Sequence, residues 1–531
     1  MANQIIEAKE RWSVRRLWLE RLIPWGLFAL KILVSIYCLV VYIPRYIRLT
    51  YIADGPARGI EAFNLAFGDF GIFQTYQFLP LQLWLWAGLL KIYPDIYWTG
   101  TALNIAAAAG TTVLLYFLGR ELAGPVAGSV AAVLFIFSPV HHNVTLSEGM
   151  ADSLFFFWTA AGVYAASRAA AGRRGAAAAG FLFAAAALTR YEGGLPLILY
   201  AAYRLFRSRP RGVAGWLLWG APLALAGILL GHKAFAVGGG GIWPLMPALK
   251  ADMAHVLTNL HWYRRTYYGL ERLWMDGRVA AAFGVLGAVL VWRRHIRNES
   301  RLLIWGGAVS LFVGLTVLVV AVGCGLCPER YFSIVLLLLF PFAGLAAVTI
   351  WRRARGRMAK IAASVLFAAA AAYTVYFDTI IKEYGYGYVG PCWTCHTLDA
   401  ELALKFRDMW RRGELAPDEI IYMEQNQDNF SNYAIQAYSN YPLNFYVSPA
   451  HEIEGDLWYL NYILKRNKIR IAIFVNSKTR RQVKSFYGAY KKFAVIYENP
   501  GHTIVVRRAP WGDGVPDFSS AVVPGECRII R

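Results

Sequence analysis

Blocks of lysine and arginine alternate along this chain with apolar stretches long enough to cross a lipid bilayer, and the intervening loops carry almost none of that charge. About 20 residues, each rising about 1.5 Å, span a hydrocarbon core of about 30 Å. Because 57% of the 531 residues are hydrophobic, 16% are charged and the mean hydropathy is +0.39, the composition excludes an ordinary soluble enzyme. The pattern predicts a mainly α-helical, multi-pass membrane protein.

The apolar stretches give about eleven candidate transmembrane helices. They cover residues 26–43, 98–118, 122–140, 150–166, 176–189, 193–206, 214–236, 279–292, 302–322, 332–351 and 361–377. From residue 381 to residue 531 the composition changes to short β-rich runs and polar helical segments, with strands expected over 419–424, 469–475, 494–498 and 503–507 and helices over 457–468 and 479–493. We therefore expect a transmembrane domain over 1–380 and a soluble α/β domain over 381–531.

The basic blocks orient the helices. They are Lys9, Arg11, Arg15, Arg16 and Arg21; Arg168, Arg173 and Arg174; Arg204, Arg207, Arg209 and Arg211; Arg293, Arg294, Arg297 and Arg301; and Arg352, Arg353, Arg355, Arg357 and Lys360. All fall on one side if the helices alternate, which predicts a cytoplasmic N-terminus and an extracytoplasmic C-terminal domain in the cell (plasma or inner) membrane. The formal net charge of +21 follows from these blocks, so nucleic acid is not expected as a partner.

Two segments need a decision for this topology to hold. Residues 78–93 are apolar, and we interpret them as a helix in the membrane interface, anchored by Trp84, Trp86 and Tyr93, which makes 45–97 one long outer loop. Residues 175–206 read as a hairpin with Arg190 near its outer tip. The basic N-terminus leads into a first helix without a cleavage site, which predicts a signal anchor. The sequence contains no phosphate-binding GxxxxGK[ST] loop, so an ATP-driven pump is not expected.

Acidic side chains gather in the outer loops, beside the apolar bundle. Asp54 lies in the first of these loops, and Glu148 and Asp152 lie in a later one. A carboxylate at a bilayer interface serves as a general base for a hydroxyl, as a cation ligand, or as a solvated loop residue. The spacing alone leaves these three roles open.

Five segments resemble a known family. The run 54–71, the segment 78–95, Ser147–Glu148 before a helix, the run 188–193 and the run 329–332 are similar in order and spacing to landmarks of polyprenyl-phosphate-sugar-dependent membrane glycosyltransferases. This GT-C class includes protein O-mannosyltransferases and aminoarabinose lipid A transferases. The resemblance implies transfer of a sugar from a lipid carrier to an extracytoplasmic glycan, lipid or protein acceptor.

In that class an acidic residue of the first outer loop acts as general base, and the resemblance assigns this role to Asp54. Gly55 and Pro56 stand where the family often has a second acidic residue, so Asp69 is the reserve candidate. Direct displacement by the acceptor implies inversion at the anomeric carbon. The candidate substrate-binding residues are Arg58, Glu61, Glu148, Asp152, Arg190, Arg264, Arg265, Arg330 and Tyr331. Arg190 and Arg330 suit a departing lipid phosphate, although each also has a neighbouring glutamate as an ion-pair partner, Glu192 or Glu329.

Metal and cysteine chemistry stay open. The outer acidic loops suit Mg²⁺ or Mn²⁺, although no cofactor is certain, and His141 and His142 suit a metal, a substrate or an ordinary polar loop. Cys324 with Cys327 and Cys392 with Cys395 form two CxxC pairs, compatible with disulfides or with one zinc site. Residues 392–396 also match the c-type haem attachment pattern.

Two other functions compete with monosaccharide transfer. Transfer or ligation of a lipid-linked oligosaccharide uses much of the same architecture, although the Trp-Trp-Asp motif of oligosaccharyltransferases is absent. A secondary transporter places ionisable residues at the midplane of repeated halves. We find no such repeat, and Lys31, His232 and Lys233 are the nearest approach to midplane charges.

Overall fold

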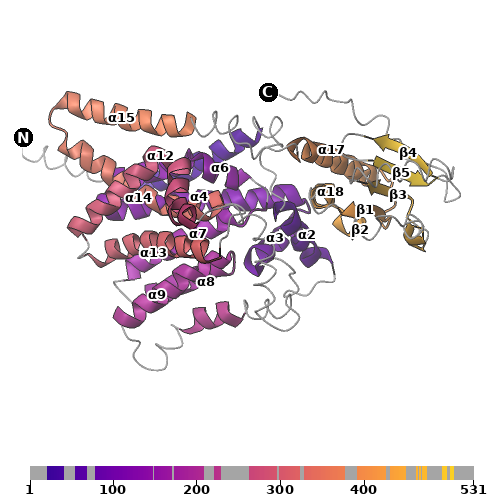
Figure 1. Ribbon diagram of the computed structural model, residues 1–531, viewed down its shortest axis with the longest axis horizontal. Helices are drawn as coiled ribbons and strands as arrows, with labels where there is room; N and C mark the ends of the chain where they lie inside the picture. Colours follow the sequence, from indigo (N-terminus) through magenta and orange to yellow (C-terminus); the bar gives the residue numbers. More distant parts are fainter. Residues whose placement is uncertain are drawn as a thin grey trace, which may run out of the picture.

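The computed structural model describes residues 21–40, 54–68, 78–146, 149–169, 173–207, 220–228, 262–295, 298–322, 328–376, 392–425, 431–449, 462–464, 466–467, 469–474, 493–498 and 503–507. A helical part and an α/β part lie side by side (Figure 1). After the helix Arg21–Val40, the helical part contains α2 (Asp54–Phe67), α3 (Pro80–Ile92), α4 (Ile96–Ala123), α5 (Pro125–Ile136), α6 (Pro139–Leu146), α7 (Asp152–Ala169), α8 (Arg173–Ala187), η1 (Tyr191–Gly193), α9 (Gly194–Arg207), α12 (Trp262–His295), α13 (Glu299–Val322), α14 (Pro328–Arg353) and α15 (Arg357–Tyr376).

Short-range signals set several of these helix ends. Asp95 precedes α4, and its carboxylate accepts a hydrogen bond from the backbone N–H of Trp98 at 3.1 Å. Gly124 ends α4 with φ of +93°, and Pro125 then starts α5, where a missing N–H costs no helical hydrogen bond. Pro139 similarly separates α6 from α5. Arg278, with φ of +40°, kinks α12 directly before its apolar part.

The described part of each of the eleven apolar segments predicted from the sequence is mainly helical, but the segment 122–140 is divided among the end of α4, α5 and the start of α6. Within the described residues, four helices are long and apolar enough to cross a membrane, or five if α5 and α6 form one bent span. These four are Arg21–Val40, Ile96–Ala123, Glu299–Val317 and Phe332–Arg353. The helical membrane bundle is thus confirmed, while the count of eleven spans stays a prediction.

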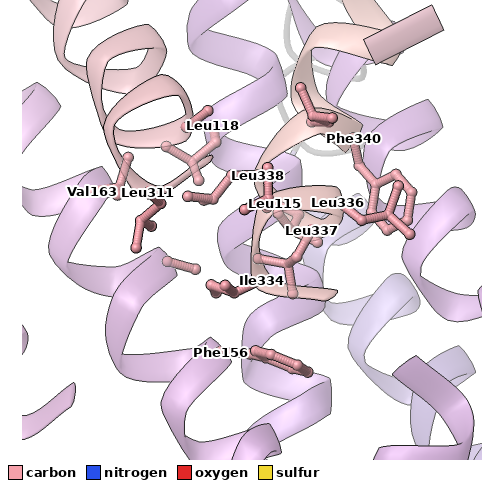
Figure 2. Close-up of a cluster of buried hydrophobic side chains, with 14 of the residues drawn as sticks. Leu115, Leu118, Phe156, Val163, Leu311, Ile334, Leu336, Leu337, Leu338 and Phe340 are labelled. Atoms are coloured by element: carbon pink, nitrogen blue, oxygen red, sulfur yellow. The ribbon is translucent and has the colours of Figure 1, made fainter. Parts of the chain in front are cut away.

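The core of the helical part lies where α4, α7, α13 and α14 meet (Figure 2). Leu115 and Leu118 of α4 approach Leu311 of α13 and the leucine run of α14, and Phe156 and Val163 of α7 close the cluster. The window of α14 that could cross a membrane is 83% buried, which makes it the central helix. A helix that is apolar on every side suits this position because it has no polar face that would favour contact with water.

The α3 helix confirms the prediction of a helix over 78–93, but the predicted interfacial role of Trp86 is wrong. Trp86 is fully buried, together with Leu83 and Leu90, whereas Ile92 and Tyr93 at the end of the helix are exposed. An apolar, tryptophan-rich sequence is compatible both with a helix in the membrane interface and with a helix in the protein core. The physical reason for burial here is the contact of α3 with α2 and α4.

The α/β part contains α17 (Cys392–Arg411), α18 (Ser431–Ser439), η3 (Pro442–Asn444) and one five-stranded sheet in the order β2-β1-β3-β5-β4. The strands are β1 (Ile421–Gln425), β2 (Phe445–Pro449), β3 (Ile471–Phe474), β4 (Phe493–Glu498) and β5 (Thr503–Arg507). β1 pairs in parallel with β2 and β3, and β5 pairs antiparallel with β3 and β4. All four strands predicted from the sequence are present. β2, α17 and α18 were not predicted. The helix expected over 457–468 is helical at 462–464 and 466, within its described part. The helix expected over 479–493 lies outside the described residues except for Phe493, which begins β4.

Asn440 joins the two parts. Its side-chain oxygen accepts from the backbone N–H of Ile96 at 2.9 Å, and its amide nitrogen donates to the Asp95 carboxylate at 3.0 Å. Arg407 of α17 lies 3.6 Å from the same carboxylate, and Ala437 of α18 packs into a cluster with Trp86. The α/β part therefore rests directly on the helices α2, α3 and α4.

We expect Asn440→Ala to loosen this contact. The change leaves the Ile96 N–H without its acceptor, which costs about 1–3 kcal/mol at a buried site. It also removes one donor to the Asp95 carboxylate, which keeps its contact with Arg407. Hydrogen exchange measured by mass spectrometry should speed up in α2 and at residues 95–98. Asn444→Ala is the matched control because Asn444 donates to carbonyls of Pro417 and Glu419 within the α/β part. Equal exchange in α2 for both variants would contradict the role of Asn440.

Candidate active site

The α2 helix presents two adjacent faces. Asp54, Arg58 and Glu61 are spaced four and three residues apart and share one face. Gly55, Gly59 and Ala62 follow the same spacing one residue later, and this second face packs against α3 and α4. Asp54 is the first residue of the helix, and the structure describes its backbone only. Its position at a helix N-terminus favours a negative charge there, either its own carboxylate or a bound phosphate.

Trp86 holds three chain segments together. Its ring lies against Gly59 of α2, Gly100 of α4 and Gly149 before α7. A side chain at Gly100 or Gly149 would overlap the ring, and one at Gly59 would press on the ring and overlap Ile96. The indole N–H donates to the Thr99 hydroxyl at 2.8 Å. Gly149 also approaches the Gly55 carbonyl and has φ of +66°, a conformation that favours glycine. The start of α2, next to Asp54, therefore lies against the turn that leads into α7.

We expect Trp86→Ala to lower the free energy of unfolding by about 3–5 kcal/mol, since it removes a large, fully buried ring that packs against three chain segments. The measurement is the free energy of unfolding in detergent micelles. Trp98→Ala provides the control because Trp98 is 51% exposed, and a surface substitution changes stability by only about 0.5 kcal/mol. A similar loss for the two variants would show that Trp86 does not support the site.

A hydrogen-bonded chain runs from α2 to the same turn. Arg58 donates to the side-chain oxygen of Gln82 at 3.0 Å, and Gln82 donates to the Gly149 carbonyl at 2.6 Å. The Arg58 guanidinium also lies 4.0 Å from the centre of the Phe78 ring. Because Arg58 and Gln82 are both buried, these contacts fix the cation one helical turn after Asp54.

A second cluster links α7 to the segment after α8. Arg190 donates to the Asp152 carboxylate at 2.6 Å and makes a two-pronged contact with Glu192, at 2.7 Å and 3.2 Å. Asp152 is fully buried, and Arg190 is 9% exposed. The arginine thus serves two carboxylates, and the pairing with Glu192 that the sequence left open is present. Backbone contact of Leu81 with the Leu188 carbonyl, at 3.2 Å, ties this segment to α3.

Tyr191 lies between the two clusters. Burial raises the pKa of its phenol, the nearby Arg58 charge lowers the pKa, and Glu192 raises it. The side chain is nevertheless 55% exposed, which places it at the open side of the site. Tyr191 therefore links the Arg58 group to the Asp152–Arg190–Glu192 group, and the role of these residues as one substrate site stays a prediction.

The remaining predicted site residues are placed only in part. Asp69, Glu148, Cys324 and Cys327 lie outside the described residues. For Arg264, Arg265, Arg330, Tyr331, Cys392 and Cys395 the structure describes the backbone only. The first two lie in the first turn of α12, Arg330 and Tyr331 begin α14, and the two cysteines begin α17.

His141 and His142 are not polar loop residues. His141 is fully buried among the rings of Phe135, Phe156 and Phe340, and its ring nitrogens contact the Ser138 hydroxyl at 2.7 Å and the Ser333 carbonyl at 2.9 Å. His142 contacts the buried Lys31 ammonium at 3.3 Å. The suggested metal-binding role of His141 is therefore wrong, since both of its ring nitrogens are engaged within the bundle.

No cluster of three or more His, Cys, Asp or Glu side chains that could hold a metal ion occurs in the part of the chain that the structure describes. The sequence left open that Asp152 binds a metal ion, but its carboxylate pairs with the Arg190 guanidinium.

Sequence reasoning missed Gln82, Trp86 and Tyr191 as parts of the site. Gln82 is a polar residue within an apolar helix, and that contrast is the signal that could have found it. Tyr191 stands between two charged residues of a motif that was recognised, so its neighbours carried a signal as well.

Comparisons with known proteins agree with this architecture. Residues 79–230 match the family model of dolichyl-phosphate-mannose-protein mannosyltransferases. ArnT from Cupriavidus metallidurans in the apo state is 13% identical, with a TM-score of 0.56 over 89% of this chain and 97% of that one. The same protein bound to undecaprenyl phosphate is 14% identical, with a TM-score of 0.54 over 90% and 98% of the two chains.

The oligosaccharyltransferase AglB from Archaeoglobus fulgidus, in complex with an inhibitory peptide and a dolichol-phosphate, is 13% identical. Its TM-score is 0.52 over 86% of this chain and 70% of that one. No curated protein matches this sequence significantly. ArnT and AglB are GT-C glycosyltransferases, so the resemblance to this class is confirmed at the level of the fold and of the family match. The matched segment contains Gln82, Trp86, Asp152 and Arg190.

Proposed function

We propose that this chain is an integral-membrane glycosyltransferase that moves a sugar from a polyprenyl-phosphate carrier to a hydroxyl of a glycan, lipid or protein acceptor. The observation that carries the proposal is the convergence of the α2 start, the Gly149 turn and the Asp152–Arg190–Glu192 cluster within a fold similar to ArnT. The proposal is supported by the position of the buried cation Arg58 one helical turn after Asp54, since transfer from a lipid phosphate needs both a general base and a positive charge.

In the proposed reaction the acceptor hydroxyl gives its proton to the Asp54 carboxylate. The acceptor oxygen forms a bond to the anomeric carbon while the bond from that carbon to the carrier phosphate breaks, and the electron pair leaves with the polyprenyl phosphate. One displacement inverts the anomeric configuration. Because the carrier phosphate is already a good leaving group, the protein mainly has to align the acceptor and stabilise the negative charge that leaves.

The cations take two different roles in this proposal. Arg58, held by Gln82 next to Asp54, stabilises the departing phosphate, with Arg330 and Tyr331 as further contacts. Arg190 acts as a positioning residue, because Asp152 and Glu192 already surround its guanidinium. Glu61, Glu148, Arg264 and Arg265 remain proposed contacts to the sugar or the acceptor. A Mg²⁺ or Mn²⁺ ion is not assigned to the described residues, and no step above uses one.

We also propose the orientation that the basic blocks imply. The N-terminus is cytoplasmic, and the site and the α/β domain face the outside of the plasma or inner membrane. The boundary between the domains lies near residue 380. The contact of Asn440 with Asp95 supports a role of the α/β domain in fixing the α2 side of the site.

A second candidate function is transfer of a whole oligosaccharide, which the similarity to the oligosaccharyltransferase AglB favours. The test is an assay in proteoliposomes with radiolabelled polyprenyl-phosphate monosaccharides and with lipid-linked oligosaccharides. Consumption of a monosaccharide carrier, with an inverted product anomer, supports the first function. Consumption of oligosaccharide carriers alone supports the second, and consumption of neither contradicts both.

A further inference from the structure

The helix α15 lies along one edge of the helical part (Figure 1). A groove of about 600 Å³ is lined by residues from the end of α14 to the first turns of α15. It is lined by Trp351, Gly356, Arg357, Lys360, Ile361, Ser364 and Val365. The lining residues of α15 recur three and four positions apart, so they form one stripe along that helix.

The groove is basic at one end and apolar at the other. Lys360 lies 4.7 Å from the centre of the Trp351 ring, which keeps its ammonium at the groove. Further along the stripe, Ile361 and Val365 are 47% and 60% exposed. The groove therefore complements a phospholipid: its basic end matches the phosphate of the head group, and its apolar end matches the acyl chains.

The charge at the basic end is not neutralised within the described chain. Five cations lie within nine residues: Arg352, Arg353, Arg355, Arg357 and Lys360. None of the ion pairs among the described residues includes them. A basic cluster next to a membrane helix attracts anionic lipids, and a pocket between helices allows one head group to be held at a fixed position.

We propose that this groove binds one anionic phospholipid of the surrounding bilayer, with its phosphate at Arg357 and Lys360 and an acyl chain along Ile361 and Val365. The groove lies at the opposite end of α14 from Arg330 and Tyr331, the α14 residues of the proposed active site, and its occupancy does not depend on the proposed reaction. Binding in the groove can be distinguished from diffuse attraction of lipids to the basic cluster, because Arg357 and Lys360 line the groove whereas Arg352 and Arg353 do not.

The test measures lipid binding to the purified protein by native mass spectrometry. The probes are phosphatidylglycerol, phosphatidylcholine with the same acyl chains, and inorganic phosphate. We expect phosphatidylglycerol to bind at least about tenfold more tightly than phosphatidylcholine. Arg357→Gln with Lys360→Gln should abolish this preference, while Arg352→Gln with Arg353→Gln, an equal loss of charge, should largely keep it.

Ser364→Phe provides an independent variant, because it fills the groove without changing the charge, and it should also reduce phosphatidylglycerol binding. Three results overturn the proposal. Equal loss in the two double variants would indicate diffuse attraction, unchanged binding by Ser364→Phe would indicate that the groove is not used, and displacement of the lipid by inorganic phosphate would indicate a site for soluble anions.

Discussion

Replacing Asp54 with asparagine is expected to lower the rate of sugar transfer by a factor of about 10²–10⁴, the contribution of a well-placed general base. Asparagine keeps the size of the side chain and its place at the start of α2, but it does not accept the acceptor proton. Binding of the lipid donor should change little, since the proposed phosphate contact is Arg58. The measurement is transfer from the preferred carrier in proteoliposomes, with donor binding measured separately.

Asp69→Asn is the matched variant, because the same substitution then falls on the reserve candidate in the same loop. Transfer that survives in Asp69→Asn and disappears in Asp54→Asn assigns the base to Asp54. The reverse result assigns it to Asp69. If both variants transfer sugar as fast as the wild-type protein, neither aspartate is the general base, and that part of the proposal is wrong.

The helices of the bundle could be predicted because their length and hydrophobicity are local properties of the sequence. Residues 98–118, for example, needed only their own composition to be assigned to α4. The pairing inside the site is not local. Asp152 and Arg190 lie 38 positions apart, and either one could have met another partner or water. Sequence motifs named both residues, whereas only the fold brings them within 2.6 Å.

The errors have physical reasons that concern long-range contacts. His141 looked like a polar residue at the mouth of a loop, yet Phe135, Phe156 and Phe340 come from three helices to enclose it. The β2 strand, Phe445–Pro449, is short and ends in proline, which weakens the strand signal of its aromatic and β-branched residues enough to leave a loop as an equal interpretation. Its pairing with β1 decides otherwise. Trp86 could be recognised only by combining three separate glycines that approach one ring.

Replacing Arg190 with methionine is expected to destabilise the protein by about 3–5 kcal/mol, since it leaves the buried carboxylate of Asp152 without its cation. The adjoining Glu192 loses its two-pronged contact at the same time. Because Asp152 starts α7 and directly follows the Gly149 turn, the change should also move the segment that lies against the start of α2. We therefore expect transfer activity to fall together with the free energy of unfolding, measured in detergent.

Arg168→Met is the control for this prediction. Arg168 contacts Glu121 at 3.5 Å, but its side chain is 63% exposed, and an exposed ion pair contributes only about 0–1 kcal/mol. Combining Arg190→Met with Asp152→Asn should recover much of the lost stability, because the uncompensated charge is then removed as well. Recovery of stability without recovery of transfer would indicate that the pair positions the site. If Arg190→Met costs no more than Arg168→Met, the buried cluster does not hold the α7 turn in place, and the proposed geometry around Asp54 loses its support.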